Sequence, residues 1–350
     1  MSAGLQDEFR SRILERKPLR LKGGGSKDFY GGPLAGAVLE TGAYSGIVSY
    51  EPTELVVTAR CGTALAELES ALAARRQFLA FEPPRFGRAT VGGAVASGLS
   101  GPRRASAGSL RDYVLGVKIM DGEGRVLKFG GEVIKNVAGF DVSRLMAGSL
   151  GTLGLILEVS LKVMPVPVGD ATLRFELPQD QALDAMNRWA GEPLPLAASG
   201  WQDDVLTLRL CGAQAAVASA CRKLGGEPLA ADVAGDFWQG LREQSAGYFA
   251  GDEPLWRLSV PSVAPPLDLP GPVLIEWGGS QRWVRGAADA ASLREVAASA
   301  GGHATLFRGG DKAGDVFAPM PPALLEVHRR LKQSFDPYGV FNPGRMYSEY

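Results

Sequence analysis

The sequence predicts an α+β protein with a glycine-rich first half and a second domain built on an antiparallel sheet. The chain has 350 residues, more than a single core of ~250–300 residues usually supports. Its 46 glycines include three dense groups, and this clustering fades after Pro165 and Pro167. Beyond that point, strand-like apolar runs alternate with helical periodicity, which is typical of a sheet covered by helices.

Short strands and helices are expected to alternate through the first half. Residues 1–17 carry apolar side chains at spacing four, which predicts an amphipathic helix rather than a signal peptide. Thr63 is expected to cap a helix with Leu65, Leu68 and Leu72 on one face. Strands are expected at residues 19–22, 55–60 and 154–163, a hairpin at 114–120 and 125–129, and a short helix at 140–147.

The second half predicts an antiparallel sheet that helices cover on one face, from about residue 170 to 300. Its expected strands are residues 172–177, 205–211, 255–260 and 273–277. Its expected helices are residues 181–189, 213–224 and 288–300, and a last helix is expected at 322–332.

Composition excludes several classes of protein. The formal charge is -1 and no apolar run approaches ~18 residues, which argues against a nucleic-acid partner and a membrane span. The three cysteines, Cys61, Cys211 and Cys221, form no CxxC pair, so we expect no iron–sulfur or zinc site and no other metal site. Of the two histidines, His303 is expected in a loop and His328 on a solvated or interface helix. These features predict a cytoplasmic protein, or one held at the inner face of the membrane through partners.

Glycine-rich segments carry the chemistry of the first half. Residues 23–27, Gly-Gly-Gly-Ser-Lys, follow a predicted strand, and backbone N–H groups of such a loop can converge on a phosphate. The order of residues fits neither a Walker loop nor a Rossmann loop, and a triple glycine can equally be a flexible turn. Residues 90–98 alternate Gly, Ala and Ser with Val, which suits a flat ligand or a close helix–helix contact.

Two further segments follow in a specific order. Residues 108–116 lead into the hairpin, and residues 136–141, Asn-Val-Ala-Gly-Phe-Asp, lead into glycines at spacing three, Gly148, Gly151 and Gly154. The order and spacing of the four segments resemble the FAD-binding domain of the vanillyl-alcohol-oxidase family, also called the PCMH fold. The resemblance covers about the first half and the last fifteen residues, where residues 341–345, Phe-Asn-Pro-Gly-Arg, are similar to the family's C-terminal signature.

The resemblance implies a fold, a cofactor and its contacts. It implies a PCMH-type FAD-binding domain of two α+β subdomains at residues 1–167, a cap domain at 168–304, and a segment at 305–350 that returns to the first domain. The glycine loop holds the pyrophosphate in that family, and the later segments run beside the flavin or close the site. The residues expected to contact FAD are Gly23, Gly24, Gly25, Ser26, Lys27, Thr90, Gly92, Gly93, Ser97, Gly108, Ser109, Arg111, Asp112, Asn136, Gly139 and Ile156.

Within the family, residues 22–27, 135–141 and 256–261 are similar to FAD-binding subunits of bacterial glycolate oxidases. That likeness implies oxidation of a small 2-hydroxy acid to a 2-oxo acid, beside a larger FAD-binding subunit and an iron–sulfur subunit that receives the electrons. Many relatives attach FAD to a His in the first glycine loop, where this chain has Gly25, or to a Cys in the Gly-Gly region. Both attachment residues are missing, so we expect FAD to be bound without a covalent link.

Residues for catalysis are harder to find. Relatives that oxidise hydroxy acids carry a His-x-Gly-Asp-Gly-Asn-x-His pattern, and this sequence has none. The candidates for a substrate carboxylate are Arg257, Arg282 and Arg308, two of them next to tryptophans that can equally be surface stacking. A stand-alone FAD-dependent 2-hydroxy-acid dehydrogenase and a structural subunit with vestigial FAD remain alternatives.

Overall fold

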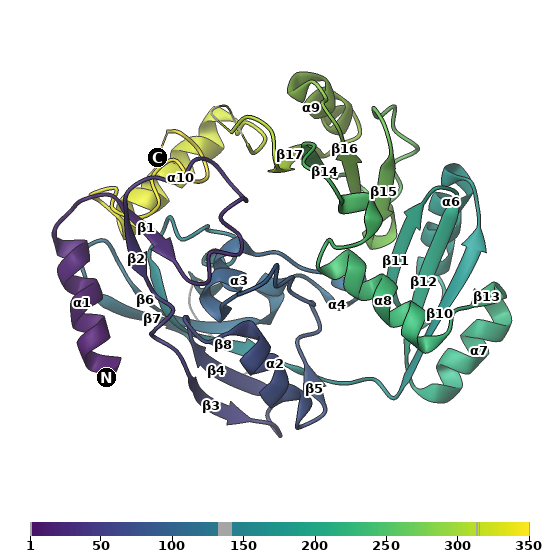
Figure 1. The fold of residues 1–350 in the computed structure, drawn as a ribbon, viewed down its shortest axis with the longest axis horizontal. Coiled ribbons are helices and arrows are strands. Elements are labelled where there is room, and N and C mark those ends of the chain that lie inside the picture. Colours follow the sequence, from purple (N-terminus) through teal and green to yellow (C-terminus); the bar gives the residue numbers. More distant parts are fainter. Residues whose placement is uncertain (1, 132–141, 313, 315, 350) are drawn as a thin grey trace.

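The computed structural model describes residues 2–131, 142–312, 314 and 316–349. They form two lobes, each built around its own sheet (Figure 1). No helix among them is long and apolar enough to cross a membrane.

The first lobe contains a five-stranded antiparallel sheet. Its strand order is β3 (Ile47–Glu51), β4 (Val56–Arg60), β8 (Leu155–Lys162), β6 (Val114–Met120) and β7 (Val126–Gly130). A parallel pair, β1 (Leu19–Lys22) and β2 (Ala37–Glu40), lies beside it. The helices of this lobe are α1 (Ser2–Leu14), α2 (Leu65–Ala73), α3 (Val91–Ser97), α4 (Arg104–Ala107), α5 (Val142–Leu145) and α10 (Pro322–Phe335).

The second lobe contains an eight-stranded antiparallel sheet. Its strand order is β13 (Glu227–Pro228), β10 (Gly169–Glu176), β12 (Val205–Gly212), β11 (Leu196–Gln202), β15 (Val273–Glu276), β16 (Gln281–Arg285), β14 (Leu255–Ser259) and β17 (His303–Arg308). Its helices are α6 (Gln179–Ala190), α7 (Gln214–Leu224), α8 (Ala231–Arg242) and α9 (Ala290–Ser299). A further pair, β5 (Gln77–Phe78) and β9 (Met164–Pro165), packs against the core of the first lobe.

Most expected elements of the first half are confirmed, including β1, the β6–β7 hairpin and the helix at the N-terminus. The expected cap of α2 is wrong. The hydroxyl of Thr63 binds the backbone of Gly46, accepting from its N–H at 2.9 Å and donating to its carbonyl at 3.1 Å. Helix α2 starts after Ala64 without a side-chain cap.

Helices cover the eight-stranded sheet on both faces, so the expectation of one covered face is wrong. Trp201 and Ile275 point to the face on which α6 and α7 pack. From the neighbouring strand positions, Leu274, Trp283 and Phe307 point to the opposite face, among α8 and residues of the first lobe. Because successive side chains of a strand alternate between faces, both sets can be buried at once.

His303 lies in a strand rather than in the expected loop. Strand β17 pairs with β14, and the boundary predicted at residue 304 falls within it. The short polar run of β16, Gln-Arg-Trp-Val-Arg, was also not expected as a strand. Strands β16 and β17 each form by pairing with β14, and the local sequence does not reveal that pairing.

The end of the chain returns to the first lobe, where α10 lies above β1 in Figure 1. Leu19 makes two backbone hydrogen bonds to the residues that flank Phe341. It donates its N–H to Val340 O at 2.7 Å, and its carbonyl accepts from Asn342 N at 2.9 Å. Lys332, buried beneath the last residues, donates to Asp336 at 2.7 Å, to Thr152 O at 2.7 Å and to Phe341 O at 3.0 Å.

Candidate functional site

A cleft with two adjoining parts lies between the glycine loop, α3 and the C-terminal segment. Ten of the residues predicted from the sequence to bind cofactor line it: Gly23, Gly24, Gly25, Ser26, Lys27, Thr90, Gly92, Gly93, Ser97 and Ile156. The tertiary structure therefore brings three separate sequence segments to one place.

The glycine loop presents unused hydrogen-bond donors. Among the residues that the structure describes, none accepts the backbone N–H groups of Gly24, Gly25, Ser26 or Lys27. The Lys27 ammonium makes two long hydrogen bonds, 3.4 Å to Ser26 Oγ and 3.4 Å to Arg85 O, and lies 5.6 Å from the ring centroid of Phe86. Burial lowers the pKa of Lys27 to about 8. Converging N–H groups and one partly desolvated ammonium fit an anion such as a phosphate.

The loop needs glycine mainly because the chain packs closely behind it. A Cβ on Gly24 would stand 1.4 Å from the carbonyl oxygen of Arg88, and one on Gly23 would stand 2.3 Å from Thr90 Oγ1. Gly25 has φ +71°, a conformation that disfavours other residues.

Helix α3 turns one glycine inward and one toward the cleft. Thr90 caps this helix by accepting from Gly93 N at 3.2 Å. A Cβ on Gly92 would stand 2.6 Å from Cys61 Cβ, so Gly92 is needed for packing. A Cβ on Gly93 would meet only Thr90 Oγ1, at 3.2 Å, so a larger residue there would extend into the cleft.

Six of the predicted residues are not placed in the cleft. Asn136 and Gly139 lie outside the described residues. Gly108, Ser109, Arg111 and Asp112 do not line either part of the cleft. Asp112 accepts from Ser109 N at 2.9 Å and from its hydroxyl at 2.7 Å, which closes a tight turn before β6.

The C-terminal segment supplies cleft residues that were not among the predicted contacts. Asn342 accepts from Leu21 N at 2.8 Å and donates to Leu150 O at 2.6 Å, so it ties β1 to the loop before β8. The buried Arg345 donates to Asp28 O at 2.7 Å and also to the carbonyls of Tyr30 and Gly32, which shapes the turn after the glycine loop. The Phe-Asn-Pro-Gly-Arg signature was the available signal for both residues.

Comparison with known proteins decides the family. A family model described as "FAD binding domain" matches residues 12–130. The glycolate oxidase subunit GlcE of Escherichia coli (strain K12) is 48% identical over 99% of this chain and 98% of its own length. The chain belongs to the GlcE family of glycolate oxidase subunits.

A second relative matches only part of the GlcE-family chain, and a solved structure matches nearly all of it at low identity. The glycolate oxidase subunit GlcD of Bacillus subtilis (strain 168) is 31% identical over 47% of this chain and 36% of its own. The solved structure of an alkyldihydroxyacetonephosphate synthase covers 97% of this chain and 75% of its own, with a TM-score of 0.68 and 15% identity, which shows the fold alone. These comparisons confirm the PCMH-type fold, and FAD is the cofactor of this GlcE-family chain.

The cleft fits FAD in two respects. Its free N–H groups and Lys27 match the negative charge of the pyrophosphate. Its walls include the small or apolar residues Gly93, Ala96 and Leu150, which suit contact with a flat ring system. The cofactor would supply two-electron acceptance, and the chain would supply binding and orientation.

Cys61 lines the cleft but is a poor site for covalent attachment. The residue is 3% exposed, and burial raises the pKa of its thiol to about 12, so the reactive thiolate is scarce at neutral pH. Neither histidine lines the cleft. Non-covalent binding of FAD stays a prediction on these grounds.

The three candidate arginines of the GlcE-family chain differ in their surroundings. Arg282 is completely buried and donates to Pro265 O at 2.6 Å, to Ala264 O at 2.5 Å and to Gly279 O at 3.3 Å, so it holds a loop and is not accessible to a substrate. Arg308 donates to Phe249 O at 3.3 Å. Arg257 reaches the first lobe, where it donates to the hydroxyl of Tyr30 at 3.0 Å.

A small cavity between the lobes contains a carboxyl group that was not expected. Glu276 is 3% exposed and lines this cavity together with Arg257. Its Oε2 accepts from Trp283 Nε1 at 2.6 Å and from Gln281 Nε2 at 3.0 Å. Burial raises the pKa of Glu276 to about 7. A carboxyl with a pKa near neutrality is able to exchange a proton. The sequence around Glu276 gave no signal of this raised pKa.

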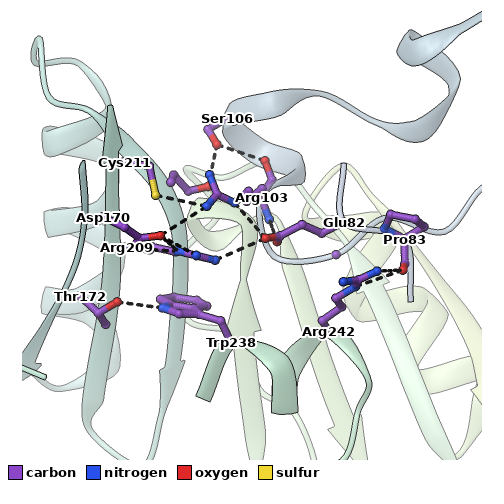
Figure 2. Close-up of polar contacts among 12 residues, drawn as sticks. Glu82, Pro83, Arg103, Ser106, Asp170, Thr172, Arg209, Cys211, Trp238 and Arg242 are labelled. Atoms are coloured by element: carbon purple, nitrogen blue, oxygen red, sulfur yellow. Dashed lines mark hydrogen bonds and ion pairs between the residues drawn. The ribbon is translucent and has the colours of Figure 1, made fainter. Parts of the chain in front are cut away.

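A partly buried ion network joins the lobes (Figure 2). Glu82 accepts from Arg103 Nε at 2.9 Å and from Arg209 Nη1 at 3.3 Å, and Arg209 also pairs with Asp170 at 2.6 Å. Arg103 additionally donates to Cys211 Sγ at 3.2 Å. The charges come from both lobes and are mutually paired, so the network fixes how the second lobe sits on the first.

Proposed function

We propose that this chain is the FAD-binding subunit of a glycolate oxidase complex. In that complex a small 2-hydroxy acid is oxidised to a 2-oxo acid, and the electrons pass to partner subunits. The observation that carries the proposal is a glycine-lined cleft with free backbone N–H groups, in a chain with a near full-length likeness to a protein named as a glycolate oxidase subunit.

The chain's own residues account for cofactor binding. The N–H groups of residues 24–27 and the Lys27 ammonium are proposed to bind the pyrophosphate of FAD. Asn342 and Arg345 hold the loop and the C-terminal segment in place, so both support the site without contributing a reactive group.

The proposed partners are a larger FAD-binding subunit and an iron–sulfur subunit. Iron–sulfur clusters commonly take four cysteine ligands, and the whole chain has three cysteines, none in a CxxC pair. Onward transfer of electrons through such a cluster therefore needs another chain. We place the complex in the cytoplasm, with any attachment to the inner face of the membrane made through these partners.

The test is anaerobic reduction of the flavin by glycolate. The purified FAD-loaded chain is mixed with glycolate, alone and after reconstitution with the two partner subunits, and the flavin absorbance is followed. Bleaching only in the reconstituted complex is the expected result. Bleaching of the isolated chain at rates of about 1–1,000 per second supports a stand-alone dehydrogenase instead.

A matched control separates the flavins of the complex. Since the larger subunit is proposed to carry its own FAD, the complex is also assembled with this chain free of FAD. The number of electrons that reach the iron–sulfur subunit is compared with and without FAD on this chain. If that number is the same, this chain's FAD does not carry electrons and the chain is a structural subunit.

A further inference from the structure

One face of the sheet in the second lobe carries a group of polar side chains. Glu276 of β15 is paired in register with Gln281 of β16, and two residues along β16, Trp283 is paired with Arg257 of β14. Side chains two residues apart on a strand lie on the same face, so these residues share one face of the sheet. They also line one cavity, whose lining includes residues 99–102 of the first lobe.

The cavity contains hydrogen-bond acceptors that lack a donor. Gln281 is 3% exposed and donates from Nε2 to Glu276 Oε2 at 3.0 Å, but no described residue donates to its Oε1. The buried Oε1 of Gln244, which lines the same cavity, also has no donor among the described residues. Within the described part of the chain, Glu276 accepts hydrogen bonds only at Oε2, from Trp283 and Gln281. Buried acceptors without a donor are destabilising, so these oxygens call for a bound group that donates.

Arg257 contributes the opposite property, unused donors. Its one hydrogen bond within the described part of the chain runs from Nη2 to the Tyr30 hydroxyl at 3.0 Å. Its guanidinium lies 5.6 Å from the ring centroids of both Tyr30 and Phe307, which hold the side chain in place. A guanidinium carries several N–H groups, so most of those on Arg257 are left for an anion.

The cavity lies beside the cofactor cleft. Residues 99–102 begin two positions after Ser97, the last residue of α3, and Ser97 lines the cleft. Phe307 lines the cavity and packs against Tyr30, which lines the cleft, at 5.1 Å between ring centroids. A ligand in the cavity would therefore be a neighbour of the cofactor, with Tyr30 between the two spaces.

We propose that this cavity binds a small 2-hydroxy acid, whose hydroxyl donates to the oxygens of Glu276 and Gln281 and whose carboxylate accepts from Arg257. The choice of acid rests on the proposed function, since the cavity itself calls for a donor group next to an anion. Its volume of about 20 Å³ holds one water-sized group, which suits the hydroxyl. The cavity is partly open, so the carboxylate can extend beyond this volume. A guanidinium suits a carboxylate because its N–H groups can bind both oxygens.

The charge state of Glu276 is compatible with an anionic ligand. Burial raises the pKa of Glu276 to about 7, and the negative charge of Glu82 acts in the same direction. A large share of this carboxyl is therefore uncharged at neutral pH, which reduces its repulsion of an incoming carboxylate.

The experiment compares glycolate with acetate, which has a carboxylate but no hydroxyl. Calorimetry measures both affinities on the FAD-loaded chain without oxygen, and the flavin absorbance of the same sample records any reduction. The wild-type chain is expected to bind glycolate about tenfold more tightly than acetate, because acetate leaves the buried acceptors without a donor. The ratio of the two affinities isolates the hydroxyl contact, since both acids have the same carboxylate.

Three substitutions separate the two contacts. Glu276→Gln replaces a carboxylate oxygen by an amide N–H₂ group, and Gln244→Met removes an acceptor. Each should lower the ratio of affinities about two- to tenfold. Arg257→Gln should weaken both acids about tenfold and leave the ratio unchanged. Glu227→Gln, at an exposed carboxyl of β13, is the matched control and should change neither affinity.

Two results would overturn the proposal. One is a wild-type chain that shows no saturable glycolate binding or binds glycolate and acetate equally. The other is a ratio of affinities that neither Glu276→Gln nor Gln244→Met lowers. FAD content and circular dichroism are checked, because Glu276→Gln alters a buried hydrogen-bond network. Gln244→Met gives an independent reading, since the Gln244 side chain makes no hydrogen bond to a described residue.

The site and the proposed function can fail separately. A complex that glycolate reduces, with a chain that does not distinguish the two acids, keeps the function and rejects the site. A chain that distinguishes them, in a complex that glycolate does not reduce, keeps the site and rejects the function.

Discussion

Replacing Lys27 by methionine should change two properties of the protein in opposite directions. The apo-protein should become more stable, because a partly buried ammonium is removed whose two hydrogen bonds are both long. Binding of FAD should become weaker, because the ammonium that faces the cleft is removed as well.

The gain in stability follows from the pKa. Burial lowers the pKa of Lys27 from 10.5 to about 8, a change of ~2.5 units, which corresponds to at most about 3 kcal/mol at ~1.4 kcal/mol per unit. The side chain keeps some exposure, so the real value is smaller. Between pH 8 and 10.5 the unfolded chain binds more protons than the folded one. The penalty is thus fully present below pH 8 and disappears as the pH rises toward 10.5, and Lys27→Met should remove this dependence.

The loss of FAD affinity follows from the bond that the ammonium makes. A charge-assisted hydrogen bond contributes ~1.5–3 kcal/mol, so Lys27→Met should raise the Kd roughly 10- to 100-fold. In the wild-type protein the affinity should be constant below pH 8 and fall above it, since Lys27 loses its proton there before FAD binds.

Urea unfolding of the apo-protein and fluorescence titration with FAD measure the two effects between pH 6 and 10. Lys312→Met is the matched control, because burial also lowers the pKa of Lys312 to about 8 but its side chain does not line the cleft. An apo-protein that is destabilised by Lys27→Met and still binds FAD as tightly as the wild type would refute the reasoning.

Three further predictions concern the cofactor and the first lobe. Gly93→Val should yield a folded protein without FAD, and a Gly93→Val protein that purifies with full FAD contradicts the placement of α3. Gly24→Ala should lower the melting temperature, because its Cβ would meet the carbonyl of Arg88 at 1.4 Å. Acid precipitation should release all flavin into the supernatant, and colour that stays with the polypeptide would show a covalent link. Lys332→Met should cost about 3–5 kcal/mol in urea unfolding, because it leaves the buried Asp336 without its cationic partner, and an unchanged midpoint would show that the pair is dispensable.

Local patterns in the sequence were enough for several elements of the first lobe. Strand β1 and the β6–β7 hairpin each carry a signal within about ten residues, in glycine spacing or apolar alternation, whereas helix α3 was not predicted from its run of small residues. The order of these segments also indicated the family. The loop after β1 could be read as an anion site because only backbone conformation and residue size were needed for that inference.

Contacts between distant residues were decided only by the tertiary structure. Asn342 meets Leu21, and Arg345 meets the carbonyls after the glycine loop, across more than 300 residues of chain. Arg282 and Arg257 looked equivalent beside their tryptophans, yet the alternation of side chains along paired strands buries the first under a loop and turns the second toward Tyr30. The raised pKa of Glu276 likewise depends on burial of its carboxyl in a cavity lined by residues of both lobes, and no local sequence pattern indicates that burial.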